Sequence, residues 1–128
     1  MDSDELPEEL DYLPIVTEQI MNGVCYTVCF DKHITSPDIY SVLVHLLRSA
    51  KESDEFVFHI ITEGGDFNTA TMLYDAIRTT KAHTTALCYG YIGSSATIIA
   101  LACKTVTPSE LSVFHIHEVE TGLAGVKS

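Results

Sequence analysis

Apolar and polar side chains alternate in two neighbouring segments near the start of the chain. Residues 14–20 and 24–30 combine this alternation with β-branched side chains, a pattern typical of strands that have one buried face. Asn22 and Gly23 stand between the two segments, and this pair suits the tight turn of a hairpin. The pattern therefore predicts that a β-hairpin opens the folded domain.

The next apolar positions repeat with a helical period. Ser36, Pro37 and Asp38 supply a capping residue, a proline at the first helical position and an early acidic group, all of which favour a helix start. The apolar residues that follow share one side of a helix: Ile39, Val42, Leu43, Leu46 and Leu47. We expect an amphipathic helix in this segment.

Strand and helix patterns alternate along the rest of the chain. Residues 56–61, 84–89 and 113–117 are β-favouring runs. Glycines end the first run, and a helical pattern of apolar side chains follows: Ala70, Leu73, Tyr74 and Ile77. Residues 90–93 are expected to form a tight connection after the second run. The helix expected over residues 96–103 is apolar on every side, which predicts that it is buried.

This alternation predicts an α/β domain, in which right-handed crossovers connect the strands of a mostly parallel sheet. The domain is expected to span residues 14–128 without an internal repeat or linker. Residues 1–13 are rich in Asp and Glu around Pro7, so we expect a mobile acidic segment that a partner or a neighbouring subunit orders.

Charge and composition exclude several classes of function. The chain has 128 residues with 46% hydrophobic content, enough for one domain with a core. Its net charge of -11 would repel nucleic acids and anionic lipid surfaces. No apolar run is long enough to cross a bilayer, and the acidic start is unlike a secretory signal, so we expect a soluble cytoplasmic protein that binds neither nucleic acid nor membrane.

The four cysteines lie in apolar segments at positions 25, 29, 88 and 103, without the paired close spacing of a zinc ribbon or a small disulfide scaffold. The spacing indicates buried, reduced thiols.

Three short motifs carry candidate chemistry, and each has a simpler structural explanation. Gly64 and Gly65 follow a buried strand, where glycine lets backbone N–H groups reach a bound oxyanion or phosphate, although a glycine pair is also a common strand-to-helix turn. Ser94 and Ser95 begin the expected buried helix, where the free amides and the helix dipole suit a nucleophile. A helix-capping role explains the two serines equally well.

His115 and His117 lie two apart on the last strand and therefore share a face. One of them could act as a general base, or both could bind a metal. A metal site needs further ligands, and none stands at suitable spacing, so no metal and no cofactor is expected. For each histidine alone, a structural role remains the simpler interpretation.

Together the three motifs resemble the proteolytic subunit of the ATP-dependent Clp protease, a serine peptidase of the ClpP/crotonase superfamily. Residues 60–66 are similar to that family's strand ending in Asn-Ser-Pro-Gly-Gly, and residues 73–75 match its Ile/Leu-Tyr-Asp motif. Residues 88–96 are similar to its Gly-Gln-Ala-Ala-Ser-Met-Gly turn, and residues 112–117 to its Ser-Arg-Ile-Met-Ile-His strand. The resemblance covers roughly residues 24–118 and has no gap between the glycine pair and the serine turn.

The resemblance implies a role for each matched residue. Ser94 is the nucleophile, His117 is the base, and the backbone N–H groups of Gly65 and Ser95 form the oxyanion hole. It also implies a spiral of βαβ units, a substrate of unfolded polypeptide, and a homo-oligomeric ring that an AAA+ unfoldase feeds. Apolar Leu123 and Val126 near the chain end agree with self-association.

The chain departs from the family pattern after the histidine strand. The family's triad aspartate and its long handle helix lie further on, so a chain ending at residue 128 is expected to lack both. Loss of the orienting acid slows a serine-protease triad about ten-thousand-fold. Two alternatives therefore stay open. One is a catalytically impaired structural or regulatory subunit, or a fragment, and the other is an acyl-CoA enzyme of the related crotonase fold.

Overall fold

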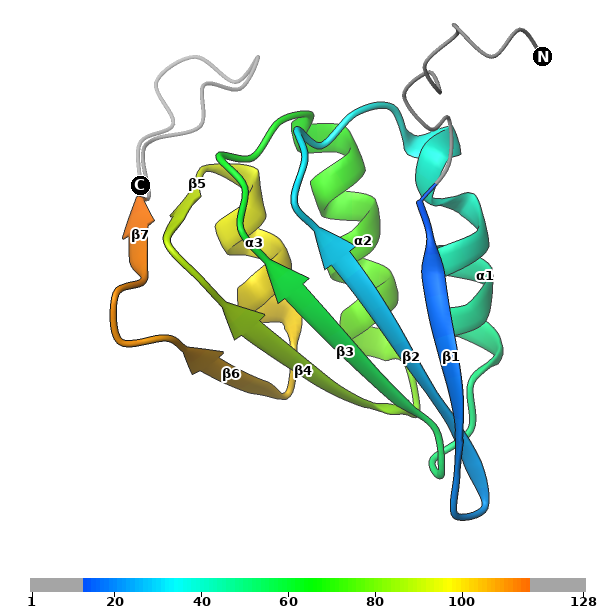
Figure 1. Ribbon diagram of the computed structural model, residues 1–128. Coiled ribbons are helices and arrows are strands. Elements are labelled where there is room, and N and C mark those ends of the chain that lie inside the picture. The colour runs from blue at the N-terminus through cyan, green and yellow to red at the C-terminus, as the bar shows by residue number, and fades with distance from the viewer. Residues whose placement is uncertain (1–12, 116–128) are drawn as a thin grey trace, which may run out of the picture.

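A five-stranded sheet with its helices on one side forms the body of the protein (Figure 1). The computed structural model describes residues 13–115. In chain order the elements are β1 (Ile15–Ile20), β2 (Gly23–Phe30), the 3-10 helix η1 (Pro37–Tyr40), α1 (Ser41–Ser49), β3 (Glu55–Ile60), α2 (Phe67–Thr79), β4 (His83–Cys88), β5 (Tyr91–Gly93), α3 (Ser95–Ala102), β6 (Thr105–Pro108) and β7 (Val113–His115). The large sheet has the strand order β1-β2-β3-β4-β6, and β5 pairs with β7 separately.

The hairpin expected at the start of the domain is confirmed. β1 runs antiparallel to β2, and Asn22 in the turn has a φ of 65°. Gly23 begins β2 against the backbone of the loop before β3, where an added Cβ would collide with the carbonyl oxygen of Ser53. Glycine is therefore required there by close approach.

The other neighbouring pairs of the large sheet, β2 with β3, β3 with β4 and β4 with β6, run parallel. This confirms the expected α/β architecture. Alternate side chains of β3 face the helices: Phe56, Phe58 and Ile60 are fully buried. Val57 and His59 between them lie half-buried on the face that no helix covers. The rings of Phe56 and Phe58 stack with centroids 6.1 Å apart, within a core that the three α-helices cover.

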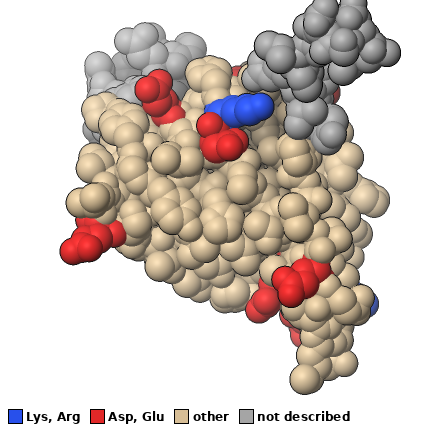
Figure 2. Space-filling model, in the orientation of Figure 1, with Lys and Arg blue, Asp and Glu red and all other residues tan. Residues whose placement is uncertain are grey.

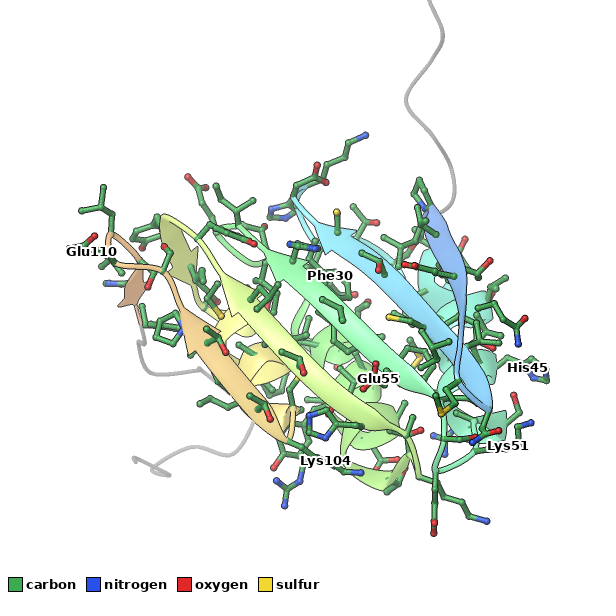
Figure 3. The ribbon with its side chains drawn as sticks, turned by 60° about the horizontal axis from the view of Figure 1, so that its bottom comes forward. Phe30, His45, Lys51, Glu55, Lys104 and Glu110 are labelled. Atoms are coloured by element: carbon green, nitrogen blue, oxygen red, sulfur yellow. The ribbon has the colours of Figure 1, made fainter. Side chains whose placement is uncertain are left out.

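The ends of the sheet differ in chemistry. Glu55 opens β3 and Lys104 precedes β6, so both lie at the amino ends of their strands (Figure 3). The Lys104 ammonium donates to the carbonyl oxygen of Ala82 at 2.8 Å. The glycine and serine motifs lie at the opposite, carboxyl end, where α/β sheets bind ligands.

The first helix begins later than its pattern predicts. Ser36 is extended and its hydroxyl caps no amide, while Pro37 to Tyr40 form a 3-10 turn closed by a bond of 3.2 Å from the Ile39 N–H to the Ser36 carbonyl. The α-helix starts only at Ser41. Proline suits either kind of helix start, so the local pattern could not distinguish them.

Two further expectations need correction. The segment expected to be a tight connection contains β5, which is part of the second sheet, and β6 was not anticipated. The helix α3 is not buried all round, because Leu101 is 57% exposed. A helix in a single layer on one face of a sheet keeps an outer side, whatever its sequence.

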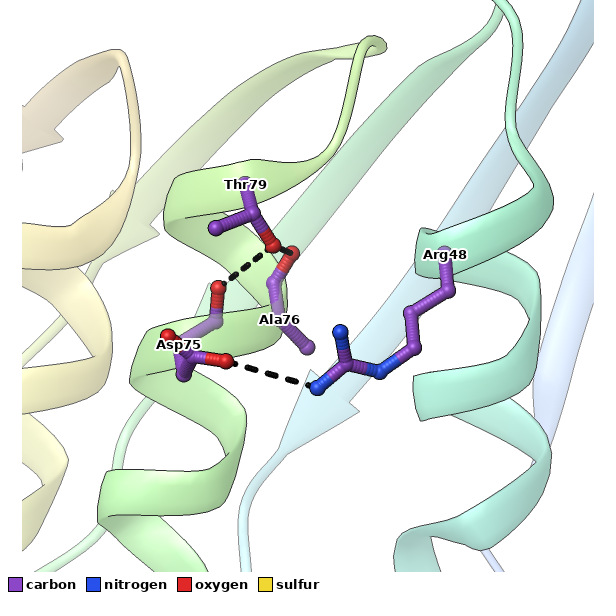
Figure 4. A network of polar contacts seen from close by, with 4 residues as sticks. All are labelled: Arg48, Asp75, Ala76 and Thr79. Atoms are coloured by element: carbon purple, nitrogen blue, oxygen red, sulfur yellow. Dashed lines mark hydrogen bonds and ion pairs between the residues drawn. The ribbon is translucent and has the colours of Figure 1, made fainter.

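A surface contact ties α1 to α2 (Figure 4). Arg48 lies 3.4 Å from a carboxylate oxygen of Asp75, and the Thr79 hydroxyl donates to the Asp75 carbonyl at 2.8 Å. Both charged side chains are more than half exposed, so the pair contributes little to stability. Within residues 13–115 no helix is long and apolar enough to cross a membrane.

Candidate active site

The turn after β3 and the turn before α3 lie in contact with each other. Gly93 donates its N–H to the carbonyl oxygen of Thr62 at 3.1 Å. A Cβ added to Gly64 would lie 2.7 Å from the Gly93 carbonyl oxygen and 3.1 Å from the Ser95 nitrogen. The fold therefore brings the glycine pair against the serine turn at the carboxyl end of the sheet.

Most polar backbone groups of the glycine turn are already hydrogen-bonded. The Gly64 N–H donates to the Thr62 hydroxyl at 3.2 Å, and the Gly64 carbonyl accepts from the Ile34 N–H at 2.9 Å. The Gly65 carbonyl accepts from the Ser95 hydroxyl at 3.2 Å. Within residues 13–115, by contrast, the Gly65 N–H donates to no acceptor.

Peptide geometry sets the direction of that free N–H. The C=O and N–H of a trans peptide point in opposite directions, and the Gly64 carbonyl points at Ile34. The Gly65 N–H therefore points away from Ile34. A side chain at Gly65 would collide with the Ile34 backbone, and its φ of 151° also favours glycine.

Ser94 occupies a strained strand-to-helix turn between β5 and α3. Its φ and ψ are 52° and -125°, a combination that non-glycine residues rarely adopt. It stands at the N-cap position of α3, yet its side chain makes no capping hydrogen bond. The helix-cap explanation of Ser94 therefore fails on geometry, and its half-buried hydroxyl remains available for chemistry.

Ser95 is the first residue of α3 and is buried, with 2% exposure. Its N–H belongs to the first helical turn, where amides lack an intrahelical partner, and among the described residues it donates to no acceptor. Within residues 13–115, the N–H groups of Gly65 and Ser95 are thus two unpaired donors in the contacting turns, one on each side of the contact.

The histidine strand runs beside the serine turn. β5 and β7 pair in parallel, with Gly93 opposite His115. The Ser94 N–H donates to the His115 carbonyl at 2.9 Å, and the exposed His115 ring stacks on Tyr91 with centroids 5.9 Å apart. His117 lies two residues further on, outside the described residues, so its predicted contact with Ser94 stays a prediction.

Two acidic residues of the glycine turn have different surroundings. Asp66 caps α2, because one of its carboxylate oxygens accepts from the Asn68 N–H at 3.1 Å and the other from the Thr69 hydroxyl at 2.9 Å. Glu63 is exposed. Asp66 therefore stabilises a helix start, a role that an acid directly before a helical pattern could have indicated.

The cysteines offer no competing buried nucleophile. Burial raises the pKa of the Cys103 thiol to about 12, and it also raises the pKa of Cys88, which keeps both thiols protonated. Cys29 is exposed, which corrects the expectation that all four thiols are buried. Residues 13–115 contain no group of three or more metal-ligating side chains.

Sequence patterns did not predict the hydrogen bonds that two hydroxyls make in this region. Thr62 bridges the glycine turn to the preceding loop, since it donates to the Lys32 carbonyl at 2.9 Å and accepts from Gly64. Ser95 joins α3 to Gly65 through its side chain. Both contacts join residues far apart in the chain, so no local pattern could have identified them.

Comparison with known proteins gives three findings. The family model described as Clp protease matches residues 19–128. The fold is similar to a ClpP1 variant from Listeria monocytogenes, with a TM-score of 0.58 and 19% identity, over 71% of this chain and 55% of that one. It is also similar to a protein assigned as an enoyl-CoA hydratase from Streptomyces coelicolor A3(2), with a TM-score of 0.50 and 17% identity, over 89% of this chain and 51% of that one.

No curated protein sequence matches the chain. The two similar structures, at this level of identity, establish the fold alone, which is of the ClpP/crotonase type expected from the sequence. The chain spans about half the length of each.

Proposed function

The chain belongs to the Clp protease family, and from that premise we propose that it is a serine-type endopeptidase subunit acting on unfolded polypeptides. The observation that carries the proposal is the state of Ser94. Its backbone is strained, its hydroxyl caps no helix amide, and the contacting turns hold two N–H groups that have no acceptor within residues 13–115. Strained residues of this kind cluster at active sites.

The proposed reaction uses these groups in order. The Ser94 hydroxyl attacks the carbonyl carbon of the scissile peptide bond while His117 accepts its proton. The negative charge on the carbonyl oxygen is stabilised by the N–H groups of Gly65 and Ser95. His117 then passes the proton to the departing amine, which leaves an acyl group on Ser94. Water hydrolyses this ester by the same steps.

We propose the family's assembly for this chain as well, a homo-oligomeric ring that receives substrate from an AAA+ unfoldase. Family membership supports this proposal. No cofactor has a role in the mechanism.

A second candidate is a catalytically impaired Clp-like subunit with a structural or regulatory role. It has the same fold and family as the peptidase and differs from it in lacking turnover at Ser94. An acyl-CoA enzyme of crotonase fold would use the Gly65 amide, but it gives no reason for a strained serine beside it. We therefore prefer the peptidase.

Hydrolysis of a short fluorogenic peptide by the full chain tests the proposal. Ser94→Ala and His117→Ala should each lower the rate at least about a hundredfold, since a positioned base alone contributes that much. His115→Ala is the matched control on the same strand and should keep most of the rate. If His115→Ala abolished turnover while His117→Ala did not, the base would be His115. If the wild-type chain hydrolysed no peptide, or if neither Ser94→Ala nor His117→Ala lowered its rate, the proposed function would be wrong.

A further inference from the structure

The Ser95 side chain makes a hydrogen bond that its place in a helix does not require. Its hydroxyl is at the start of α3 and donates to the carbonyl oxygen of Gly65 at 3.2 Å. The residue is 2% exposed, so little water competes with this bond. The matching position of the family carries methionine, which has no donor, so family membership gives no reason for this contact.

The bond holds a segment of the backbone that has little stiffness of its own. Gly64 and Gly65 have φ values of 110° and 151°, and glycine explores such angles with little steric restriction. The Gly64 carbonyl is fixed by Ile34, on one side of the Gly65 N–H. The Gly65 carbonyl, on the other side, accepts from Ser95, and the Asp66 N–H of the same peptide donates to the Ile34 carbonyl at 2.9 Å. The Gly65 N–H, which has no acceptor within residues 13–115, thus lies between two anchored carbonyls.

We propose that the Ser95 hydroxyl is a positioning residue for the oxyanion hole, separate from the role of its own N–H. It fixes Gly65 so that the Gly65 N–H keeps one direction as charge develops on the substrate oxygen. A donor that is already oriented stabilises the transition state better than one that must first reorient. The inference rests on the proposed function, because it presupposes that Ser94 is acylated.

The test measures how fast a fluorophosphonate phosphonylates Ser94 in the full chain with release of fluoride, and it determines the maximal rate and the half-saturating probe concentration separately. Ser95→Ala removes the donor. Ser95→Cys keeps a side chain of similar shape but has only a weak hydrogen-bond donor. This variant replaces Ser95→Ala in the test if the alanine variant does not fold. Thr80→Ala is the matched control. It removes a buried hydroxyl that donates to the Leu47 carbonyl at 2.6 Å, at the C-terminal end of α2, away from the serine turn.

Both Ser95 variants should lower the maximal rate about tenfold, less than the hundredfold or more lost when a donor is deleted, because the Gly65 amide is loosened but still present. The half-saturating concentration should hardly change. Thr80→Ala should lower the unfolding midpoint and leave the maximal rate of the folded protein unaltered.

A wild-type maximal rate in Ser95→Ala or Ser95→Cys would overturn the positioning role and leave the proposed function intact. An equal loss of rate in Thr80→Ala would also overturn it, since any buried hydroxyl would then have the same effect. If wild-type Ser94 were not phosphonylated at all, the proposed function would fall, and the inference with it.

Discussion

Ser94 holds a backbone conformation that glycine would hold more easily. Strained φ and ψ angles cost about 1–3 kcal/mol, and the cost persists only where the surroundings enforce it. Here β5 leads into the turn, α3 leads out of it, and the Ser94 N–H is bound to the His115 carbonyl. A half-buried serine kept in this conformation, without a capping bond, supports the nucleophilic role proposed above.

Replacing Ser94 by glycine should therefore stabilise the fold relative to replacing it by alanine. Relief of about 1–3 kcal/mol of strain outweighs the roughly 0.5–1 kcal/mol that glycine loses through its greater unfolded-state entropy. We expect the free energy of unfolding of Ser94→Gly to exceed that of Ser94→Ala by about 1 kcal/mol in urea unfolding, because both variants lack the hydroxyl but only alanine keeps the strain. A glycine variant less stable than the alanine variant would show that the turn is unstrained.

At the scale of elements, the local pattern of apolar residues was sufficient to predict each helix or strand whose apolar residues repeat with a clear period. The hairpin, the buried strand β3 and the helix α2 follow from alternation, apolar runs and helical spacing. The strands β5 and β6 have three or four residues each and were not predicted, whereas the strand expected over residues 113–117 is confirmed as β7 over Val113–His115. β5 and β6 form because β7 and β4 offer them backbone partners, a tertiary effect that the sequence does not display.

The features of the candidate site also fall into two groups, those that the sequence identified and those that only the fold determines. Gly65, Ser94 and Ser95 were identified by resemblance to a family motif, and the fold brings their turns together. The hydroxyl bonds of Thr62 and Ser95 could not be anticipated, because each depends on which distant carbonyl the folded chain presents.

Asp54 joins several elements at the far end of the sheet. Its carboxylate accepts from the N–H of Lys51 at 2.9 Å and from the N–H of Val24 at 3.0 Å, and its carbonyl accepts from His83. The bond from the Lys51 amide is the main cause that lowers the pKa of Asp54, in spite of burial, which acts in the opposite direction.

The free energy of unfolding should depend on pH through this group. A carboxyl whose pKa is lower in the folded state stabilises the protein above its unfolded pKa, and this stability is lost as pH falls through the folded pKa. Asp54→Asn should thus be clearly less stable than wild type at pH 7 in urea unfolding, with the difference shrinking at acid pH. Asp75→Asn, which breaks an exposed pair worth about 1 kcal/mol or less, is the control. An Asp54→Asn deficit that stayed constant down to the lowest pH would contradict the assignment.

At the scale of the whole molecule, charge and apolar surface act on assembly in opposite directions. The net charge of -11 makes copies of the chain repel one another. Acidic groups lie at the margins of the face that Figure 2 shows, and the surface between them is mostly uncharged. Met21 and Leu111 are more than four-fifths exposed. Association into a ring, which stays a prediction, would have to bury apolar surface of this kind while salt screens the acids.

The central claim is that this fold activates one serine, and a single labelling experiment tests it most directly. The full chain is treated with a fluorophosphonate, digested, and the modified residue is identified by mass spectrometry. We predict one adduct on Ser94, which is absent from Ser94→Ala and forms far more slowly in His117→Ala than in His115→Ala. No adduct under conditions that label an active serine peptidase, or an adduct that persists in Ser94→Ala, would contradict the claim.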